Sequence, residues 1–306
     1  MKKNNFSESI YASKEQLLDL KKKAQMFSFG KAKLLVDVGF GEHVSPFKTK
    51  GLDFQEVRIY QPGDDVRLID WKITAKHNKP YTKLYTDEKE QQIFVIVDMR
   101  SHMKFATNGV FKSVVAAKSG AFLSFLAQNK NDKIGFCVLG DDKISCAIPQ
   151  IGKEALSSFL DALGVEGDVE KYSSEEMTLF HAVSKSEKFV RRGAHVFIIS
   201  DFVDYNDEIA TIVRRISKKA TCSLIHVYDR LEKEFPKGLF PVTNGEEIIF
   251  LNSKTKSFQK KYALEFNAFV SSLHEVAKNE RVGYLPLTTE DEFINLLAFY
   301  CKGGLL

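Results

Sequence analysis

The chain has 306 residues, of which 44% are hydrophobic and 27% charged, a composition that can bury a sizeable core and excludes a disordered chain. The formal net charge of +4 is too small to indicate a nucleic-acid-binding protein. No apolar run reaches the roughly 18 residues of a membrane-spanning helix, and the N-terminus lacks the apolar segment of a secretory signal. We therefore expect a cytoplasmic protein without a membrane span or a nucleic-acid partner.

The cysteines support the same compartment. Cys137, Cys146, Cys222 and Cys301 form no C-x-x-C pair and no zinc-binding spacing. Three of them lie in apolar, strand-like runs, where cysteine behaves as a small buried hydrophobe. This usage indicates a reducing compartment.

The first 90 residues are predicted to combine a helix with a β-rich segment. Residues 13–27 have helical periodicity, with Ser13 as the cap and Gln16 at the capping-box spacing. Residues 28–60 lose that periodicity and are interrupted by glycine and proline, which favours short strands and loops. We expect residues 1–90 to be distinct from a larger domain at residues 91–306.

Strands and helices alternate from residue 91 onward. Residues 93–97 (IFVIV) form a continuous β-branched and aromatic run, which is typical of a strand buried on both faces. Similar runs indicate strands at 134–139, 144–148, 195–200, 222–228 and 282–287, and an edge hairpin near 240–251. Helices are expected near 109–128, 153–163, 174–191, 207–219, 258–279 and 290–300. The pattern predicts an α/β, doubly wound, mostly parallel sheet with a smaller β-rich N-terminal segment.

Two of the expected buried strands end in an aspartate. Asp98 follows the run at 93–97, and Asp201 follows the run at 195–200. In open α/β sheets, ligands bind outside the carboxyl ends of the strands. These two carboxylates therefore mark the candidate functional edge.

Common catalytic and nucleotide-binding motifs are missing from the sequence. It contains no G-x-x-x-x-G-K-[ST] phosphate loop, no H-E-x-x-H zinc motif and no G-x-S-x-G nucleophile elbow. No G-x-G-x-x-G follows the first buried strand. These absences argue against the usual nucleotide, dinucleotide, zinc-protease and hydrolase classes.

A dense polar cluster occupies residues 51–80. As a catalytic set, Asp64, Asp65 and Asp70 would hold a metal or act as acid and base. As a structural set, they would pair with Arg58 and Arg67 and fix a turn ahead of Trp71, which the balanced charges favour. The turn itself is indicated by the sequence PGDD at 62–65.

The same segment resembles the domain-of-unknown-function 58 family. Further matches are the SDF sequence at 200–202 and the D..E...P..G pattern that begins at Asp229, so the resemblance covers about residues 40–250. The agreeing positions in the first motif are Gly51, Phe54, Glu56, Arg58, Tyr60, Pro62–Asp65, Arg67, Ile69–Trp71 and Ala75. The resemblance implies a von Willebrand factor A-like domain and an association with AAA+ ATPases of the MoxR type.

A von Willebrand factor A domain usually carries a metal-ion-dependent adhesion site. Its signature is D-x-S-x-S after the first strand, a threonine from a later loop and an aspartate after a further strand. Asp98 and Asp201 match the two aspartates, and Thr178 is the candidate threonine. The two serines are replaced by Arg100 and His102; Ser101, between them, is out of phase.

Arg100 changes what such a site can do. A guanidinium does not ligate Mg²⁺ and repels it. Arg100 could take the place of the ion by pairing with Asp98 or Asp201, could receive a carboxylate of a partner, or could point to solvent and leave the site inactive. Metal binding with His102 as a ligand is a third-ranked alternative, because nitrogen suits Mg²⁺ poorly.

Two functions from different classes follow. The first is a non-enzymatic interaction or adaptor protein with a degenerate metal site and no cofactor, binding its partner through Asp98, Arg100, Ser101, His102, Thr178 and Asp201; the resemblance implies a MoxR-type AAA+ ATPase as partner. The alternative is a divalent-metal-dependent hydrolase that uses Asp64, Asp65 and Asp70, or Asp98 and Asp201, with Mg²⁺.

Overall fold

The computed structural model describes residues 10–26, 52–77, 79–87, 91–164, 177–243, 248–280 and 282–290. The chain divides into two compact units. The larger unit comprises residues 1–38 and 91–306, and the smaller comprises residues 39–90. Each unit is described by itself.

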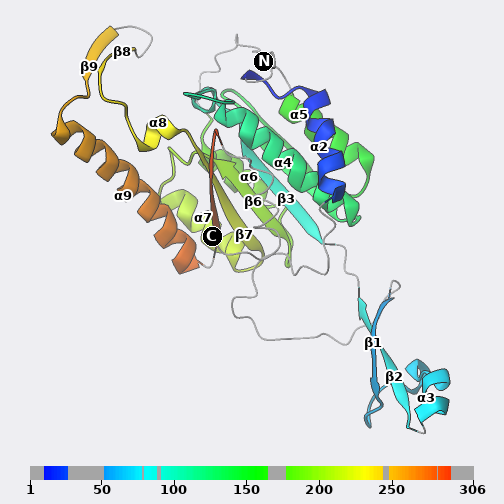
Figure 1. Ribbon diagram of the computed structural model, residues 1–306. Coiled ribbons are helices and arrows are strands. Elements are labelled where there is room, and N and C mark those ends of the chain that lie inside the picture. Colours follow the sequence, from blue (N-terminus) through cyan, green and yellow to red (C-terminus); the bar gives the residue numbers. More distant parts are fainter. Residues whose placement is uncertain are drawn as a thin grey trace. The chain divides into compact units, whose positions relative to one another are not determined.

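A six-stranded sheet forms the centre of the larger unit (Figure 1). Its order is β10-β7-β6-β3-β4-β5, and every neighbouring pair is parallel except β4–β5. The strands are β3 (Gln92–Asp98), β4 (Lys133–Leu139), β5 (Ile144–Gln150), β6 (His195–Ser200), β7 (Thr221–Tyr228) and β10 (Gly283–Thr288). The continuous apolar runs of β3 and β6 are fully buried, as expected for central parallel strands.

Helices cover both faces of this sheet, so the α/β class with a mixed, mostly parallel sheet is confirmed. One face packs against α4 (Lys112–Asn129), α5 (Lys153–Gly164) and α2 (Lys14–Met26). The other face packs against α6 (Leu179–Glu187), α7 (Asp207–Ser217) and part of α9 (Lys256–Glu280). Alternation along β3 divides the two cores, since Val95 and Val97 point to the first and Phe94 and Ile96 to the second.

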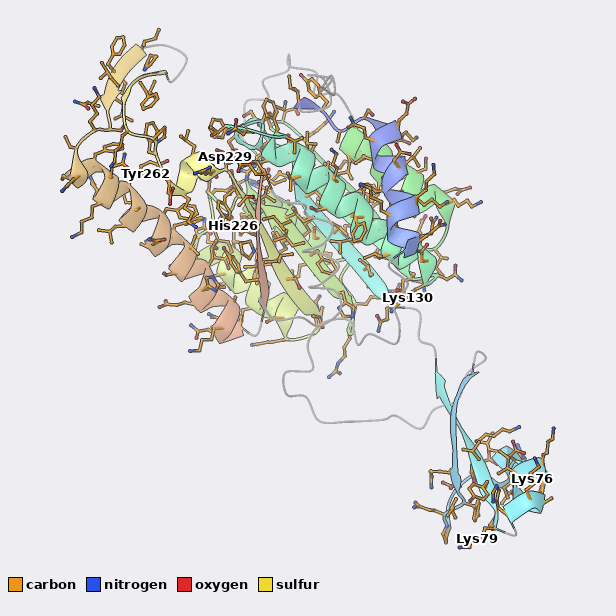
Figure 2. The ribbon with its side chains drawn as sticks, in the orientation of Figure 1. Lys76, Lys79, Lys130, His226, Asp229 and Tyr262 are labelled. Carbon is orange, nitrogen blue, oxygen red and sulfur yellow. A yellow bond between two sulfur atoms is a disulfide. The ribbon has the colours of Figure 1, made fainter. Side chains whose placement is uncertain are left out.

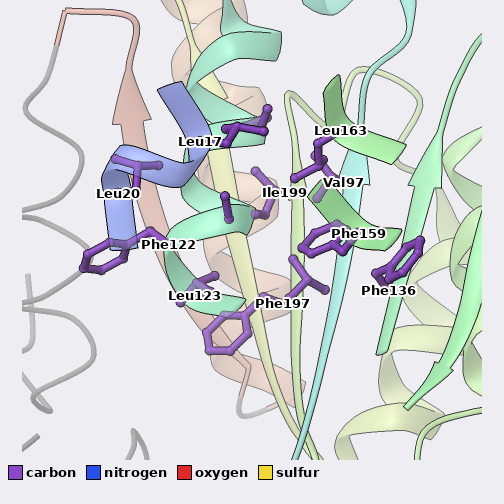
Figure 3. Close-up of a cluster of buried hydrophobic side chains, with 14 of the residues drawn as sticks. Leu17, Leu20, Val97, Phe122, Leu123, Phe136, Phe159, Leu163, Phe197 and Ile199 are labelled. Carbon is purple, nitrogen blue, oxygen red and sulfur yellow. The ribbon is translucent and has the colours of Figure 1, made fainter. Parts of the chain in front are cut away.

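The N-terminal helix α2 packs in the larger unit. Leu17 and Ala24 are completely buried and belong to the core cluster that α4 and α5 form with the sheet (Figure 3). The predicted cap is present: the Ser13 N–H donates to Gln16 Oε1 and the Gln16 N–H donates to Ser13 Oγ, both at 3.3 Å. The sequence suggested one segment at residues 1–90, whereas residues 1–38 group with the larger unit and the apolar face of α2 is buried against α4.

The smaller unit contains an antiparallel pair and two short helices. β1 (Leu52–Ile59) pairs with β2 (Tyr81–Asp87), with a register shift between Phe54 and Glu56. Between them lie a 3₁₀ turn, η1 (Val66–Leu68), and α3 (Trp71–His77). The predicted PGDD turn is present, with Gly63 at a φ of +106°, a conformation that favours glycine.

Several expected elements are described only in part. The helix expected at 174–191 is described as α6, while residues 165–176 lie outside the described residues, as do residues 28–51 and the expected helix at 291–300. The expected hairpin is present as β8 (Leu239–Thr243) and β9 (Ile248–Asn252), but these strands form a separate two-stranded sheet. The described helices include none that is long and apolar enough to span a membrane.

Two cysteines are joined across the antiparallel strands. Cys137 of β4 lies opposite Cys146 of β5, and the pair forms a disulfide, whereas Cys222 is free and buried. The prediction that these cysteines are unpaired small hydrophobes is therefore wrong for the first two. The pairing follows from β5 turning back beside β4, a register that cysteine spacing alone does not show.

Candidate functional site

The site lies where β3 and β6 end beside each other. These strands are parallel neighbours with Val97 opposite Ile199, so the residues after them reach the same edge of the sheet. Asp98 is completely buried and Asp201 is 4% exposed. The structure therefore brings together the two aspartates that the sequence selected.

Asp98 is held by a dense set of donors. Its Oδ1 accepts from Nε of Arg100 at 3.0 Å and from the backbone N–H of Arg100 at 3.2 Å. Its Oδ2 accepts from a terminal nitrogen of Arg100 at 2.6 Å and from Oγ of Ser200 at 2.7 Å. Both carboxylate oxygens of Asp98 therefore accept hydrogen bonds from the Arg100 guanidinium, and each accepts one further hydrogen bond from the protein.

The other side of the Arg100 guanidinium meets a second carboxylate. Its two terminal nitrogens donate to Asp204 at 2.8 and 3.0 Å, and one also donates to the carbonyl oxygen of Met177 at 3.3 Å. A guanidinium has five N–H donors, and these contacts use all of them. Arg100 is 4% exposed.

This arrangement decides between the alternatives for Arg100. It pairs with Asp98 as expected, but its second partner is Asp204 rather than Asp201. The alternative that Arg100 points to solvent is wrong, because the side chain is buried between two carboxylates. Direct capture of a partner's carboxylate finds no unused donor on the guanidinium.

Asp201 has its own cations. Lys112, at the start of α4, places Nζ 2.7 Å from one oxygen of Asp201 and 2.6 Å from Glu232. His102 places Nε2 3.3 Å from the other oxygen of Asp201 and 3.6 Å from Asp98, without an aligned hydrogen bond to either. We call the set Asp98, Arg100, His102, Lys112, Asp201, Asp204 and Glu232 the charge cluster.

The charge cluster favours the ionised forms of Asp98, Asp201 and His102. Burial opposes ionisation of Asp98 and Asp201, but the hydrogen-bonded Arg100 beside Asp98 and the close contacts of His102 and Lys112 with Asp201 outweigh it, so both pKa values are lowered. Burial also opposes the charge on His102, yet Asp201 and Asp98 raise its pKa to about 9. The two carboxylates therefore favour the protonated, positively charged form of His102.

The backbone turns sharply after β6, beside Asp201 and Asp204 of the charge cluster. Phe202 has a φ of +58°, rare for a side chain of this size, and is completely buried. Its N–H donates to Ser200 Oγ at 3.0 Å, and the Val203 N–H donates to Asp201 Oδ1 at 3.3 Å. The sharp turn buries the phenylalanine and leaves Val203 70% exposed.

Asp229, at the end of β7, fixes the neighbouring segments (Figure 2). It accepts from the backbone and hydroxyl of Thr107, from the Thr289 hydroxyl at 2.7 Å and from the Leu231 N–H at 2.8 Å. Its own N–H donates to Glu232 at 2.8 Å, which closes a capping box at α8 (Arg230–Lys233). Asp229 is thus a structural group that positions Glu232 for Lys112.

Two of the predicted site residues have other partners. Thr178 caps α6, and its hydroxyl is bonded within that helix end, 2.9 Å from Nδ1 of His181. Ser101 is exposed, and its N–H donates to Asp141 at 2.7 Å. The segment of Thr178 still borders the site, since Met177 and Leu179 contact Arg100 and Asp204 through their backbones.

Sequence reasoning did not select Lys112, Asp204 and Glu232. Lys112 is the first residue of α4, a largely buried helix that contains one other lysine, Lys118, so a buried lysine at its start is a weak signal in the sequence. Asp204 follows the SDF sequence by two residues, and Glu232 belongs to the D..E pattern already noted at Asp229. These residues come together only through tertiary packing, because Lys112 lies 89 residues before Asp201 and 120 residues before Glu232 in the sequence.

The residues present do not fit a resident Mg²⁺. Oxygen and nitrogen atoms of Asp98, His102 and Asp201 do lie within 4.8 Å of one another, a spacing that could hold an ion. However, Arg100 and Lys112 already bond these carboxylates, and a divalent cation would have to displace fixed positive charges.

In the smaller unit, the acidic motif has structural contacts. Asp64 accepts from Arg58 at 2.6 Å and from the Gln61 N–H at 2.9 Å. Asp65 caps η1 by accepting from the Arg67 N–H at 3.0 Å. Asp70 accepts from two N–H groups at the start of α3 and pairs with Lys83, which the sequence did not select. The predicted pairing with Arg58 is present at Asp64.

The fold and the site together define an α/β protein with a buried, charge-compensated cluster at the carboxyl edge of a mixed sheet. The family model described as "Protein of unknown function DUF58" matches residues 56–271. The chain belongs to this family.

Similar proteins carry no assigned activity. "Uncharacterized protein Rv1480" of Mycobacterium tuberculosis is 26% identical over 204 residues, covering 64% of this chain and 61% of that protein, and "Uncharacterized protein Mb1516" of Mycobacterium bovis gives the same values. "Uncharacterized protein YeaD" of Bacillus subtilis is 31% identical over 80 residues, covering 24% of this chain and 20% of that protein. The chain thus spans about three fifths of the mycobacterial relatives.

Among solved structures, the chain is similar to a conserved hypothetical protein, BatB, from Bacteroides thetaiotaomicron. That match has a TM-score of 0.41 at 12% identity and covers 69% of this chain and 96% of the other. The assignment of the fold rests on the strand order and packing described above.

Proposed function

We propose that this chain is an interaction protein, not an enzyme, whose binding edge is a von Willebrand factor A-like site with Arg100 in the place of the metal ion. The family resemblance suggests a MoxR-type AAA+ ATPase as the protein partner. The site would require no cofactor. It would therefore bind its partner independently of the divalent-ion concentration.

The observation that carries this proposal is the double pairing of Arg100. A metal in an adhesion site holds the carboxylates of separate loops at fixed positions. Here one guanidinium bridges Asp98, the last residue of β3, and Asp204, in the loop after β6, with bidentate geometry toward both. Arg100 can therefore hold Asp98 and Asp204 in position as a metal ion would, and unlike an ion it is covalently attached to the chain.

The exposed groups above this bridge suggest the kind of contact. Val203 is 70% exposed, Ser101 is exposed, and the side chain of His102 is 32% exposed. A partner would bury Val203 as an apolar anchor and use the rim for polar contacts. The buried charges would hold these residues in position without contacting the partner themselves.

The first test is isothermal titration of the chelator-stripped chain with Mg²⁺ and Mn²⁺. We expect no binding to the wild type and a gain of binding in Arg100→Ser/His102→Ser, which restores the D-x-S-x-S pattern. Circular dichroism confirms that the variant is folded. Metal binding by the wild type that disappears in Asp98→Asn would refute the substitution of the ion by Arg100.

A second test concerns the partner. A MoxR-type ATPase would be titrated with the wild type, with Val203→Asp and, as a matched control, with Val66→Asp in the smaller unit, where the valine is 60% exposed. We expect affinity for the ATPase to fall by at least tenfold in Val203→Asp only. Equal affinity for wild type and Val203→Asp would exclude this edge as the docking site.

The second candidate function is a divalent-metal-dependent hydrolase. It is favoured by one observation, the spacing of Asp98, His102 and Asp201 within 4.8 Å. It requires Arg100 and Lys112 to move away from these carboxylates on metal binding. Micromolar Mn²⁺ binding by the wild type, together with hydrolysis of a generic phosphoester that Asp201→Asn abolishes, would favour this function over the first.

A further inference from the structure

A cavity of about 770 Å³ opens beside the carboxyl ends of β3 and β4 in the larger unit. Its lining comes from the start of α2, the loop after β3, the first turn of α4, the turn between β4 and β5, and the end of α5. Figure 1 shows these three helices together on one face of the sheet. The volume lies within the roughly 300–1,000 Å³ of small-molecule pockets, and open α/β sheets bind ligands at this edge.

Part of the lining is apolar. Val114, Val138 and Leu163 line the cavity, and each is buried in the core cluster around α4. Met99, which follows β3, also lines it and packs against the same cluster. Side chains of this kind dominate small-molecule pockets and favour the hydrocarbon part of a ligand.

The first turn of α4 supplies a positive end of a helix. This helix of 18 residues begins after Phe111, which provides no side-chain cap. The N–H groups of Lys112 and Val114 donate to carbonyl oxygens of the preceding loop, each at 3.0 Å, whereas the Ser113 N–H has no acceptor among the described residues. Unpaired N–H groups and the helix dipole make such a terminus attractive to an anion.

The Ser113 side chain adds an independent sign of a ligand. It is 4% exposed and lines the cavity, yet its hydroxyl has no hydrogen-bond partner in the part of the chain that the structure describes. Ser124, further along the same helix, bonds in the usual way to the carbonyl oxygen of Gly120, at 2.9 Å. Ser113 lies in the first turn and has no preceding helical carbonyl. Because buried polar groups are normally satisfied, its hydroxyl is available to a molecule in the cavity.

The charges of the lining favour an anion at this position. The lining contains three lysines, Lys14, Lys104 and Lys143, and two carboxylates, Asp141 and Asp142. Lys14 pairs with Asp161, and Asp141 accepts from the Ser101 N–H at 2.7 Å. In the turn after β4, Lys143 follows Asp142 directly and offsets its charge. Lys104 is half-buried and forms no ion pair among the described residues, so its positive charge is the one left to a ligand.

We propose that this cavity binds a small organic anion, in which a carboxylate or a phosphate is joined to a hydrocarbon chain. The anionic group accepts from the N–H and the hydroxyl of Ser113, and Lys104 supplies the compensating charge. The hydrocarbon chain lies against Val114, Val138 and Leu163. This inference does not rest on the proposed function, because Val203 is not among the lining residues.

Isothermal titration of the full chain with hexanoate and with hexyl phosphate tests the proposal and distinguishes the two anionic groups. At least one of them should bind saturably below about 10 mM, as expected for a ligand of so few atoms. Hexanol lacks the charge, and acetate and inorganic phosphate lack the hydrocarbon chain. Each of these three should bind at least tenfold more weakly than the better of the two anions.

Substitutions of Ser113 separate ligand binding from the stability of α4. Ser113→Asp places a negative charge where the anion would bind, whereas an acidic residue in the first turn stabilises a helix. This variant should therefore lose binding while its stability in urea is unchanged or higher. Ser113→Ala should weaken binding at least tenfold, because it removes a donor to a charged group.

Ser119→Ala is the matched control. Ser119 is completely buried in the same helix and does not line the cavity, so the variant should bind the anion like the wild type. Val203→Asp should also bind it like the wild type, which keeps failure of this proposal distinguishable from failure of the proposed function.

Three results would overturn the proposal. The first is the absence of saturable binding of both hexanoate and hexyl phosphate in this concentration range. The second is an anion that binds Ser113→Asp as tightly as the wild type, which would place the ligand elsewhere on the chain. The third is an equal loss of affinity in Ser113→Ala and Ser119→Ala, which would trace the effect to the packing of α4.

Discussion

At the scale of single residues, Arg100 links the ends of β3 and β6. It contributes two ion pairs in a place where its side chain is 5% exposed and Asp98 is completely buried. Bringing such charges out of water is costly, and the mutual attraction offsets that cost only while the geometry is intact. Removing one member of the Arg100–Asp98 pair should therefore reduce stability strongly, because the other charge stays buried without its partner.

Arg100→Ala should lower the free energy of unfolding by about 3–5 kcal/mol, because it leaves the buried carboxylate of Asp98 uncompensated. Urea denaturation followed by far-ultraviolet circular dichroism measures this change. Arg215→Ala is the control: Arg215 also forms a bidentate pair, with Glu187, but its side chain is 52% exposed, so little change is expected. Equal effects of the two substitutions would contradict the buried pairing.

Arg100→Ala/Asp98→Asn separates the cost of the unpaired charge from lost packing. The double variant removes both charges and should recover part of the stability that Arg100→Ala loses. A double variant less stable than Arg100→Ala would show that Asp98 contributes through contacts other than its charge.

His102 should make stability depend on pH on the alkaline side. Its folded-state pKa of about 9 exceeds the roughly 6.5 of an unfolded chain, so its contribution is complete below that lower value and is lost as the pH rises to about 9. Allowing for its partial exposure, the loss should be about 1–2 kcal/mol. His102→Gln should flatten the curve of unfolding free energy between these pH values. An unchanged slope in the variant would assign the dependence to another group.

At the scale of elements, the apolar pattern predicted most of the sheet. The runs that became β3, β6 and β7 are continuous because both faces of each strand are buried, and their ends located Asp98 and Asp201 correctly. The apolar pattern did not predict that β5 runs antiparallel to β4. This direction depends on the tight connection after β4, where the Gly140 N–H donates to the carbonyl oxygen of Lys143 at 2.9 Å.

The partners within the site were less predictable than the site itself. Arg100 could be expected to pair with an aspartate, but the choice of Asp204 depends on the turn at Phe202, whose positive φ no sequence rule favours. Thr178 was selected as a ligand, yet threonine before a helix is equally a cap, and the structure uses it so. Local signals thus identified the edge, and packing determined its contacts.

The placement of α2 gives a prediction at this scale. Leu17 is completely buried in the core shared with α4, whereas the adjacent Leu18 is 45% exposed. Leu17→Ala should therefore destabilise the larger unit by about 2–4 kcal/mol, and Leu18→Ala should have little effect. Thermal or urea unfolding monitored by circular dichroism distinguishes them. Similar small effects of both would mean that α2 contributes little to this core.

At the scale of the whole molecule, the two units differ in how much apolar surface they bury. The larger unit has two extensive cores on opposite faces of its sheet. In the smaller unit, the side chains described between Val57 and Lys83 include one that is buried, Thr82. Because hydrophobic burial is the main favourable term in folding, the smaller unit should be the less stable of the two.

Trp71 allows the two units to be followed separately. It is the chain's one tryptophan, is 71% exposed and is the first residue of α3 in the smaller unit. Its fluorescence should change at a lower urea concentration than the far-ultraviolet circular dichroism, which reports mainly the larger unit. Arg58→Ala, which removes the partner of Asp64, should shift only the fluorescence transition.

Coincident transitions in the wild type would contradict this prediction, because they would require the smaller unit to be stabilised by the larger one until both unfold together. Leu17→Ala provides the reciprocal control, since it should shift the circular dichroism transition and leave the fluorescence transition in place. If Arg58→Ala shifts only the fluorescence transition and Leu17→Ala shifts only the circular dichroism transition, the two units unfold independently. Two parallel shifts would instead show that the units share one cooperative transition.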